Sequence, residues 1–230
     1  MKKLEEIRVD VCVKPQEDYK SIQLHVFADA SKIAYCACAY VRVEYPDHIR
    51  VTLVTSKGRI SPRKPMSIIK MEVQAAVIGS RMLQSAIRAF DEINFTSTHL
   101  WSDSKSYLHM LNNDSKRFEV WFSVRLAEIH ESTNLADWNY CPTKLNVADL
   151  LSRGVMPGDE KRSKEFYNGP SFLKLPPTEW PTQAQEDTSE TIAVSHLYAT
   201  SKEKDSETET GLERMIKYYD NLFKLKRKSG

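Results

Sequence analysis

The chain has 230 residues, of which 41% are hydrophobic and 28% are charged, and its formal net charge is +2. This composition is typical of a globular chain with one substantial domain and extensions, and no stretch approaches the roughly 20 apolar residues of a membrane span. The N-terminus carries lysines without the apolar segment of a secretory signal, so we expect an intracellular protein of the cytoplasm or nucleus that does not bind membranes.

The first predicted elements are three strands over residues 24–31, 34–45 and 50–60, which are rich in Val, Tyr and Thr and are separated by short turns. They predict an antiparallel meander. Cys36 and Cys38, two apart on the second strand, are expected to share one face as small apolar side chains. With Cys12 and Cys141 they form neither C-x-x-C pairs nor zinc-ligand spacing with histidine, which argues against a zinc site or a disulfide framework.

Helical periodicity follows over residues 68–90, with apolar side chains recurring on one face. A strand over 97–104, two helices over 105–113 and 118–132, and a last strand over 136–143 come next. Residues 146–154 predict a short helix with Asn146 as N-cap and Gly154 as its end. The order β-β-β-α-β-α-α-β-α predicts an α/β fold with a five-stranded mixed sheet flanked by helices.

Composition also divides the chain. We expect an N-terminal extension over residues 1–20 and the α/β domain over 21–155. Residues 156–182 are rich in proline and aromatic residues, and "GPSFLKLPPTEWP" is expected to wrap against the domain as irregular chain. Residues 183–230 are predicted to be a polar linker and a basic tail that contains "KLKRK" near its end.

Four acidic residues occupy unusual places in this pattern. Asp29 lies in the apolar strand "LHVFADAS", where a buried carboxylate is costly without compensation. Glu72 falls at the edge of the apolar stripe of its helix, and Asp103 lies in the strand "HLWSDS", near the core-like Leu100 and Trp101. Asp149 falls in the first turn of the last short helix. Four such carboxylates would repel one another and raise each other's pKa unless a metal ion lies among them.

Each acid also has a simpler interpretation. A first-turn Asp such as Asp149 more often serves as a capping partner, because a helix N-terminus favours negative charge. Glu72 alone is an ordinary solvated helix residue, and Asp29 and Asp103 alone are strand-end residues turned toward a loop. The order of the elements that carry the four acids distinguishes these interpretations.

The segments "FADAS", "KMEVQAA", "WSDS" and "NVADLLSRG" occur in the order and on the elements of ribonuclease H domains. With "TSKGRISP", "PTKLNVADLLSRG" and the downstream "GPSFLKLPPTEWP", the span from about residue 24 to 181 resembles the ribonuclease H domain of Pao and BEL type LTR retrotransposon polyproteins. The resemblance implies a ribonuclease H-like fold. Carried over residue by residue, it implies a site made of Asp29, Glu72, Asp103 and Asp149.

The resemblance further implies a metal-dependent endonuclease that cuts the RNA strand of RNA-DNA hybrids. Two Mg²⁺ ions, with Mn²⁺ as a substitute, would be held by Asp29 as bridging ligand, by Glu72 and Asp103 at one ion, and by Asp149 at the other. The hybrid is the implied partner, together with the reverse transcriptase and integrase of the parent element. One departure concerns "YCPTKLN", which lacks the histidine that many ribonuclease H domains carry before the last acid and which is linked to product release.

A basic run leads into the predicted long helix. The segment "SKGRISPRKPMSIIK" contains five basic residues and no acid, so beside four carboxylates it is a candidate for holding phosphates, while a solvated loop is the simpler interpretation. The terminal "KLKRK" is either a soluble tail or an import signal. Trp101, Trp121 and Trp138 are expected in the core. The residues assigned to nucleic-acid binding are Lys57, Arg59, Arg63 and Lys64.

Two alternatives to a nuclease stay open at the level of sequence. One is a catalytically silent nucleic-acid-binding module that keeps the fold, and the other is a domesticated interaction protein. The intact set of four acids favours cleavage, because a silent module has no need of them. Integrases and transposases share the fold but resemble a three-acid pattern ending in a helical Glu, whereas here the last acid is Asp149 in "NVAD".

Overall fold

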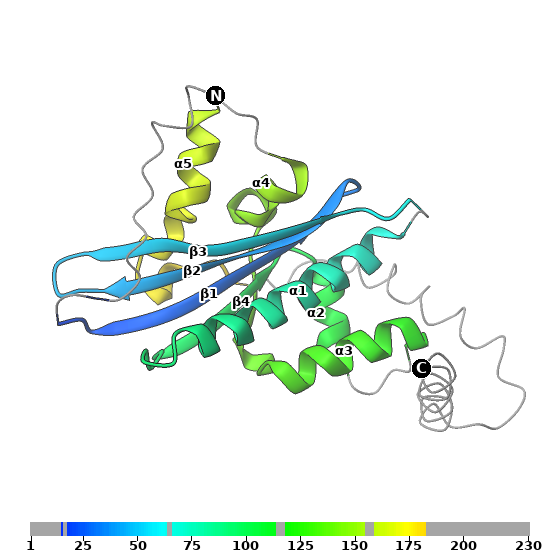
Figure 1. The fold of residues 1–230 in the computed structure, drawn as a ribbon, viewed down its shortest axis with the longest axis horizontal. Coiled ribbons are helices and arrows are strands. Elements are labelled where there is room, and N and C mark those ends of the chain that lie inside the picture. The colour runs from blue at the N-terminus through cyan, green and yellow to red at the C-terminus, as the bar shows by residue number, and fades with distance from the viewer. Residues whose placement is uncertain (1–14, 16–17, 64–65, 114–117, 155–158, 183–230) are drawn as a thin grey trace, which may run out of the picture.

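The computed structural model describes residues 15, 18–63, 66–113, 118–154 and 159–182. Its centre is one five-stranded sheet of order β3-β2-β1-β4-β5 (Figure 1). The first three strands form an antiparallel meander, while β4 runs parallel to β1 and β5 runs parallel to β4. The predicted five-stranded mixed sheet is therefore confirmed. The strands are β1 (Ser21–Ala30), β2 (Ala34–Glu44), β3 (Ile49–Ile60), β4 (Ser97–Ser102) and β5 (Trp138–Tyr140).

Helices lie on both faces of this sheet. Figure 1 shows α1, α2 and α3 on one side of the strands and α4 and α5 on the other. The long helix α1 starts at a serine cap, because Ser67 Oγ accepts a hydrogen bond from the backbone N–H of Lys70. The helices are α1 (Ile68–Ala89), α2 (Lys105–Leu111), α3 (Val120–Ser132), α4 (Ala148–Arg153) and α5 (Glu160–Asn168).

The larger core lies between the sheet and α1. Alternate residues of β1, namely Ile22, Leu24 and Val26, face α1 and are 0–1% exposed. They pack with Val73 and Leu83 of the helix. Burial of each such side chain stabilises the fold by about 1.5–3 kcal/mol, so the α1 stripe fixes the helix on the sheet and also orients Glu72.

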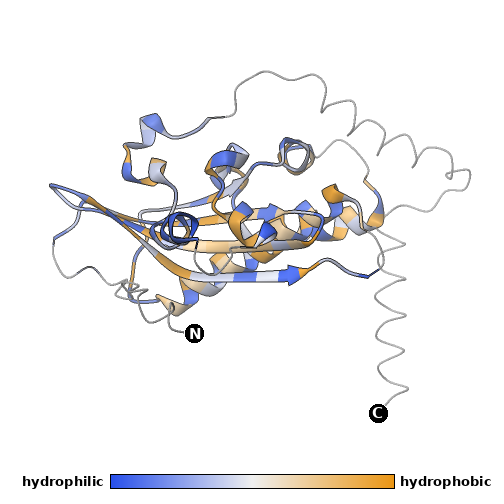
Figure 2. Ribbon diagram, turned by 90° about the horizontal axis from the view of Figure 1, so that it is seen from above, coloured by the Kyte–Doolittle hydropathy of each residue, from blue (hydrophilic) through white to orange (hydrophobic). Residues whose placement is uncertain are grey.

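A second core covers the opposite face of the sheet. Phe27, Trp101 and Tyr40 are buried there, together with Phe172 and Leu173 from the C-terminal part of the described chain. Figure 2 shows hydrophobic colours along the strands, while α5 is strongly hydrophilic. Phe172 and Leu173, which follow α4 and α5 in the chain, therefore complete this core.

The small and aromatic residues assigned to the core are placed as follows. Cys36 and Cys38 are buried on the same face, as predicted, and with Cys141 they are free thiols. Trp101 and Trp138 are buried. Trp121 is half-buried against the larger core, with the guanidinium of Arg125 3.8 Å from its ring centroid.

The segment after Gly154 contains one element that the sequence did not predict. Helix α5 has only two aromatic residues, Phe166 and Tyr167, among charged neighbours, so it lacks an apolar stripe. It is capped instead, because Asp159 Oδ1 accepts from the backbone N–H of Arg162 at 3.1 Å. Residues 169–181 contain only the short 3₁₀ turns Ser171–Lys174 and Pro177–Glu179.

Most of the predicted N-terminal extension and all of the linker and tail over 183–230 lie outside the described residues. Among the helices that the structure does describe, none combines the length and the apolar character that crossing a bilayer requires.

Candidate metal centre

Two of the predicted acids are brought together by strand pairing. β1 and β4 are adjacent and parallel, with Ala28 opposite Ser102. The next residues along the two strands, Asp29 and Asp103, therefore project from the same end of the sheet. Asp103 lies just past the last residue of β4, where the chain turns into α2. Strand pairing thus places Asp29 and Asp103 at one location.

Glu72 reaches this location from α1. Oxygen atoms of Asp29, Glu72 and Asp103 all lie within 4.8 Å of one another. Asp29 is only 2% exposed, and the other two are half-buried. Three carboxylates this close are the donor arrangement expected for a divalent cation with oxygen ligands.

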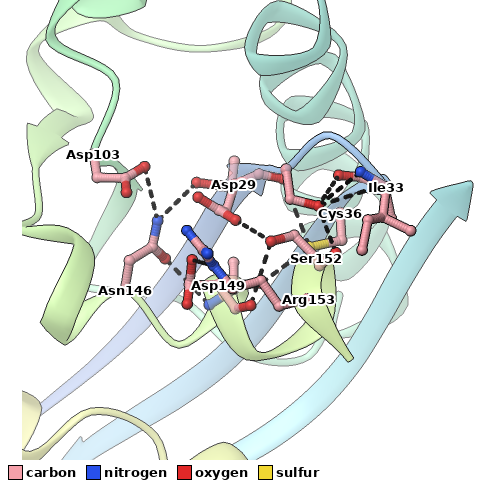
Figure 3. A network of polar contacts seen from close by, with 12 residues as sticks. Asp29, Ile33, Cys36, Asp103, Asn146, Asp149, Ser152 and Arg153 are labelled. Carbon is pink, nitrogen blue, oxygen red and sulfur yellow. Dashed lines mark hydrogen bonds and ion pairs between the residues drawn. The ribbon is translucent and has the colours of Figure 1, made fainter. Parts of the chain in front are cut away.

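Asp149 enters the same cleft from the opposite face of the sheet. It lies in the first turn of α4, as predicted, and lines a cleft of about 650 Å³ together with the other three acids. Its carboxylate is not part of the close cluster of three. Asp149 Oδ1 instead accepts a hydrogen bond from Nε of Arg153 at 2.5 Å (Figure 3). The two residues form an i,i+4 ion pair on α4.

The electrostatics of the cluster follow from burial and repulsion. Burial, and after it the charge of Asp103, raises the pKa of Asp29 to about 7. Burial and the charges of Asp29 and Asp103 raise the pKa of Glu72 to about 9. The cluster therefore holds protons near neutral pH unless a cation compensates its charge. The donor set, which is all oxygen and strongly acidic, fits Mg²⁺ or Mn²⁺.

Asn146 makes the capping contact predicted for it and has a further role. Helix α4 starts one residue later than expected, with Val147 at the N-cap position and no side-chain cap. The Asn146 side chain is 3% exposed, and its Nδ2 donates to the carbonyl of Ala28 at 3.1 Å and to Oδ1 of Asp103 at 3.4 Å. Its Oδ1 still accepts from the backbone N–H of Ala148 at 3.2 Å, so the amide links β1, Asp103 and the start of α4 (Figure 3).

Ser152 was missed by the sequence analysis. Its hydroxyl donates to Oδ2 of Asp29, and the serine lies on α4 three residues after Asp149 (Figure 3). A serine in a short helix carries no signal in the sequence that such a contact will form. Gly154 ends the helix with a φ of 84°, as its predicted role requires.

The described residues assigned to nucleic-acid binding, Lys57, Arg59 and Arg63, do not line this cleft. Lys57 and Arg59 are exposed on the end of β3, where Gly58 pairs with Cys36, which in turn pairs with Asp29. The two basic residues are thus level with Asp29 and two strands away, about 10 Å by the usual strand spacing. They line a separate groove between β3 and α1. Arg63 is exposed, and Lys64 lies outside the described residues.

The family model described as "Pao retrotransposon-like RNaseH-like domain" matches residues 1–104, which confirms the predicted resemblance over that span. The matched span contains Asp29, Glu72 and Asp103, while Asp149 lies beyond it. The comparison with curated proteins gives no match.

Three of the solved structures that match this chain are described as ribonuclease H proteins. The N-terminal RNase H domain of rv2228c from Mycobacterium tuberculosis is 14% identical with a TM-score of 0.37, covering 55% of this chain and 86% of that one. LC11-RNase H1 in complex with an RNA/DNA hybrid is 12% identical with a TM-score of 0.36, covering 54% and 88%. RNase H1 from Halobacterium salinarum NRC-1 is 15% identical with a TM-score of 0.33, covering 54% and 88%.

Proposed function

We propose that this protein is a retrotransposon-derived, metal-dependent endonuclease that hydrolyses the RNA strand of RNA-DNA hybrids. The observation that carries the proposal is the cluster of Asp29, Glu72 and Asp103 within 4.8 Å, formed by chain segments inside the span that the family model matches. Burial and repulsion drive two of these carboxylates, Asp29 and Glu72, toward protonation, which is a costly arrangement for a purely structural role.

Each residue of the site has a role in the proposed reaction. Asp29, Glu72 and Asp103 would hold one divalent ion, and Asp29 with Asp149 would hold a second. Bound Mg²⁺ supplies an activated water and stabilises the leaving oxygen of the phosphodiester. Asn146 holds the Asp103 carboxylate and keeps α4 against β1. Glu72, Asp103 and Asp149 line the cleft and are partly exposed, so a phosphate of the substrate can approach them.

Substrate and partners are part of the same proposal. The RNA strand of a hybrid would be distinguished from DNA by contacts to its 2′-hydroxyls. Lys57, Arg59, Arg63 and Lys64 would hold phosphates beside the cleft. Such a domain acts on the product of reverse transcription, so the reverse transcriptase and integrase of the parent element are its proposed partners, inside the cell.

One observation favours the alternative of a silent binding module. The ion pair with Arg153 engages Asp149, the acid that the second ion would require. A module that binds nucleic acid without cutting it would tolerate this pair permanently, whereas an active enzyme must break it when metal binds.

Substrate preference tests the proposal. The full chain is incubated with Mg²⁺ and one labelled RNA, presented as a hybrid with DNA, as an RNA duplex and as a single strand. We expect cleavage of the RNA in the hybrid alone. Binding to the hybrid without cleavage would replace the proposal by the silent module, and equal cleavage of all three would rule out hybrid recognition.

A further inference from the structure

Ser152 connects the two halves of the acidic site. It lies on α4, is 2% exposed, and its hydroxyl donates to Oδ2 of Asp29 on β1 (Figure 3). The same short helix carries Asp149 in its first turn. A single hydroxyl therefore links the most buried of the four acids to the helix that supplies the fourth.

A local role for this hydroxyl has to be weighed first. Serine in a helix commonly bonds to a carbonyl in the preceding turn, and the carbonyl of Asp149 lies 3.3 Å from Ser152 Oγ. The contact with the Asp29 carboxylate is the shorter of the two. Hydrogen bonds to an ionised acceptor are about twice as strong as neutral ones, so the ionised Asp29 carboxylate, the form that binds a cation, is the preferred acceptor of the proton.

The backbone of Ser152 is held separately from its side chain. The hydroxyl of Ser31 donates to the carbonyl of Ser152 at 2.7 Å, which fastens the end of α4 to the turn after β1. The helix position therefore does not depend on the Ser152 hydroxyl alone. Removal of that hydroxyl would release the Asp29 carboxylate while the Ser31 contact still holds α4.

We propose that Ser152 is a positioning residue of the metal centre, whose hydroxyl holds the Asp29 carboxylate in the orientation that receives a divalent cation. The inference rests on the proposed metal centre. A carboxylate accepts through two oxygens and about four lone-pair sites, so one bond to Oδ2 leaves Oδ1 and part of Oδ2 for a cation. Partners of ligating carboxylates typically contribute 10–100-fold to metal affinity.

The test measures metal binding without nucleic acid. Mn²⁺ is titrated into the full chain, and free Mn²⁺ is followed by electron paramagnetic resonance for the wild type, Ser152→Ala and Ser31→Ala, with a thermal melt of each. We expect Ser152→Ala to bind Mn²⁺ about tenfold more weakly or worse. Ser31→Ala removes a comparable contact of α4 that touches no carboxylate, so it should bind Mn²⁺ like the wild type.

Should Ser152→Ala fail to fold, Ser152→Cys replaces it, because the thiol is similar in size and a weak donor. Equal Mn²⁺ affinity of the Ser152 variant and the wild type would overturn the positioning role. An equal loss of Mn²⁺ affinity in Ser31→Ala would overturn it as well. The same proteins are then assayed on a hybrid. Absence of hybrid cleavage by the wild type, with a Ser152-dependent Mn²⁺ affinity, would reject the proposed function and leave the positioning role intact.

Discussion

Nε of Arg42 donates a hydrogen bond of 2.8 Å to the carbonyl of Leu173, which joins the second strand of the sheet to a residue 131 positions later. The Arg42 side chain is fully buried, and its guanidinium also lies 5.5 Å from the ring centroid of Trp180. Residues 169–180 therefore form part of the folded domain, although they have little regular structure.

This contact predicts where the chain can be shortened. Truncation after Thr182 should leave the thermal transition nearly intact, because it removes none of the described packing. Truncation after Gly154 removes Phe172 and Leu173 from the second core and takes away the carbonyl partner of buried Arg42, so it should abolish cooperative unfolding. Loss of the transition on truncation after Thr182 would show that residues 183–230 contribute to the fold.

A point variant tests the same core more finely. Phe172 is 4% exposed, so Phe172→Ala should lower the free energy of unfolding by about 3–5 kcal/mol. Leu175, in the same segment, is 40% exposed, and Leu175→Ala serves as the control with a much smaller loss. Urea denaturation measures both. Similar losses in the two variants would mean that Phe172 does not anchor this segment.

The raised pKa values predict how stability depends on pH without metal. The pKa of Asp29 is raised to about 7 and that of Glu72 to about 9, so the folded state keeps protons that the unfolded state releases near pH 4. Their contribution to stability is therefore present at low pH and is lost as pH rises through about 7 and then about 9. Thermal melts in a chelator should show a falling melting temperature across this window.

Glu72→Gln and added Mg²⁺ provide the controls for this pH dependence. The glutamine variant lacks the group that titrates last, so its melting temperature should fall less at alkaline pH. Mg²⁺ should raise the melting temperature of the wild type most where the carboxylates are ionised. A melting temperature of the wild type that does not change with pH in chelator would contradict the raised pKa values of Asp29 and Glu72.

The ion pair between Asp149 and Arg153 predicts competition with metal. Arg153→Gln should lower the Mg²⁺ concentration needed for half-maximal hybrid cleavage, because Asp149 no longer has to leave the guanidinium. Stability should change little, because the Arg153 side chain is 61% exposed and solvent screens an exposed ion pair. Arg162→Gln, which removes the exposed pair with Asp159 on α5, is the matched control. An unchanged or higher Mg²⁺ requirement in Arg153→Gln would mean that the pair does not restrain Asp149.

The exposed basic residues on β3 predict a change in salt dependence. Replacing Lys57 and Arg59 by serine should weaken hybrid binding, and each lost phosphate contact should reduce the log-log salt slope by roughly 0.7–0.9. The control replaces Lys161 and Lys164 of α5 by serine. These two lysines are exposed on the opposite face of the sheet and carry the same total charge as Lys57 and Arg59. Equal slopes for the β3 variant and the wild type would exclude Lys57 and Arg59 from the binding surface.

The fold and the three clustered acids were accessible from sequence for a physical reason. Asp29 lies within an apolar strand, Asp103 follows the end of another, and Glu72 lies at the edge of a long apolar stripe, so period-2 and period-3.6 patterns place all three. Strand order then brings them together, and the resemblance to a known family supplies that order.

The remaining features depend on tertiary contacts that no periodicity records. The hydroxyl of Ser152 and the amide of Asn146 reach Asp29 and Asp103 across more than 40 residues of sequence. The pairing of Arg153 with Asp149 is compatible with the sequence spacing, but so is a free carboxylate. Helix α5 was missed because its stability comes from a cap and from contacts with β3 rather than from an apolar stripe.

Cleavage of a labelled RNA-DNA hybrid by the full chain, titrated with Mg²⁺ and compared with Asp29→Asn, tests the central claim most directly. Removal of one buried like charge should leave the variant folded, with a melting temperature in chelator at least as high as that of the wild type. We predict Mg²⁺-dependent cutting of the RNA strand by the wild type and a loss of orders of magnitude in Asp29→Asn. Cutting at the wild-type rate by a folded Asp29→Asn protein would contradict the proposed metal centre.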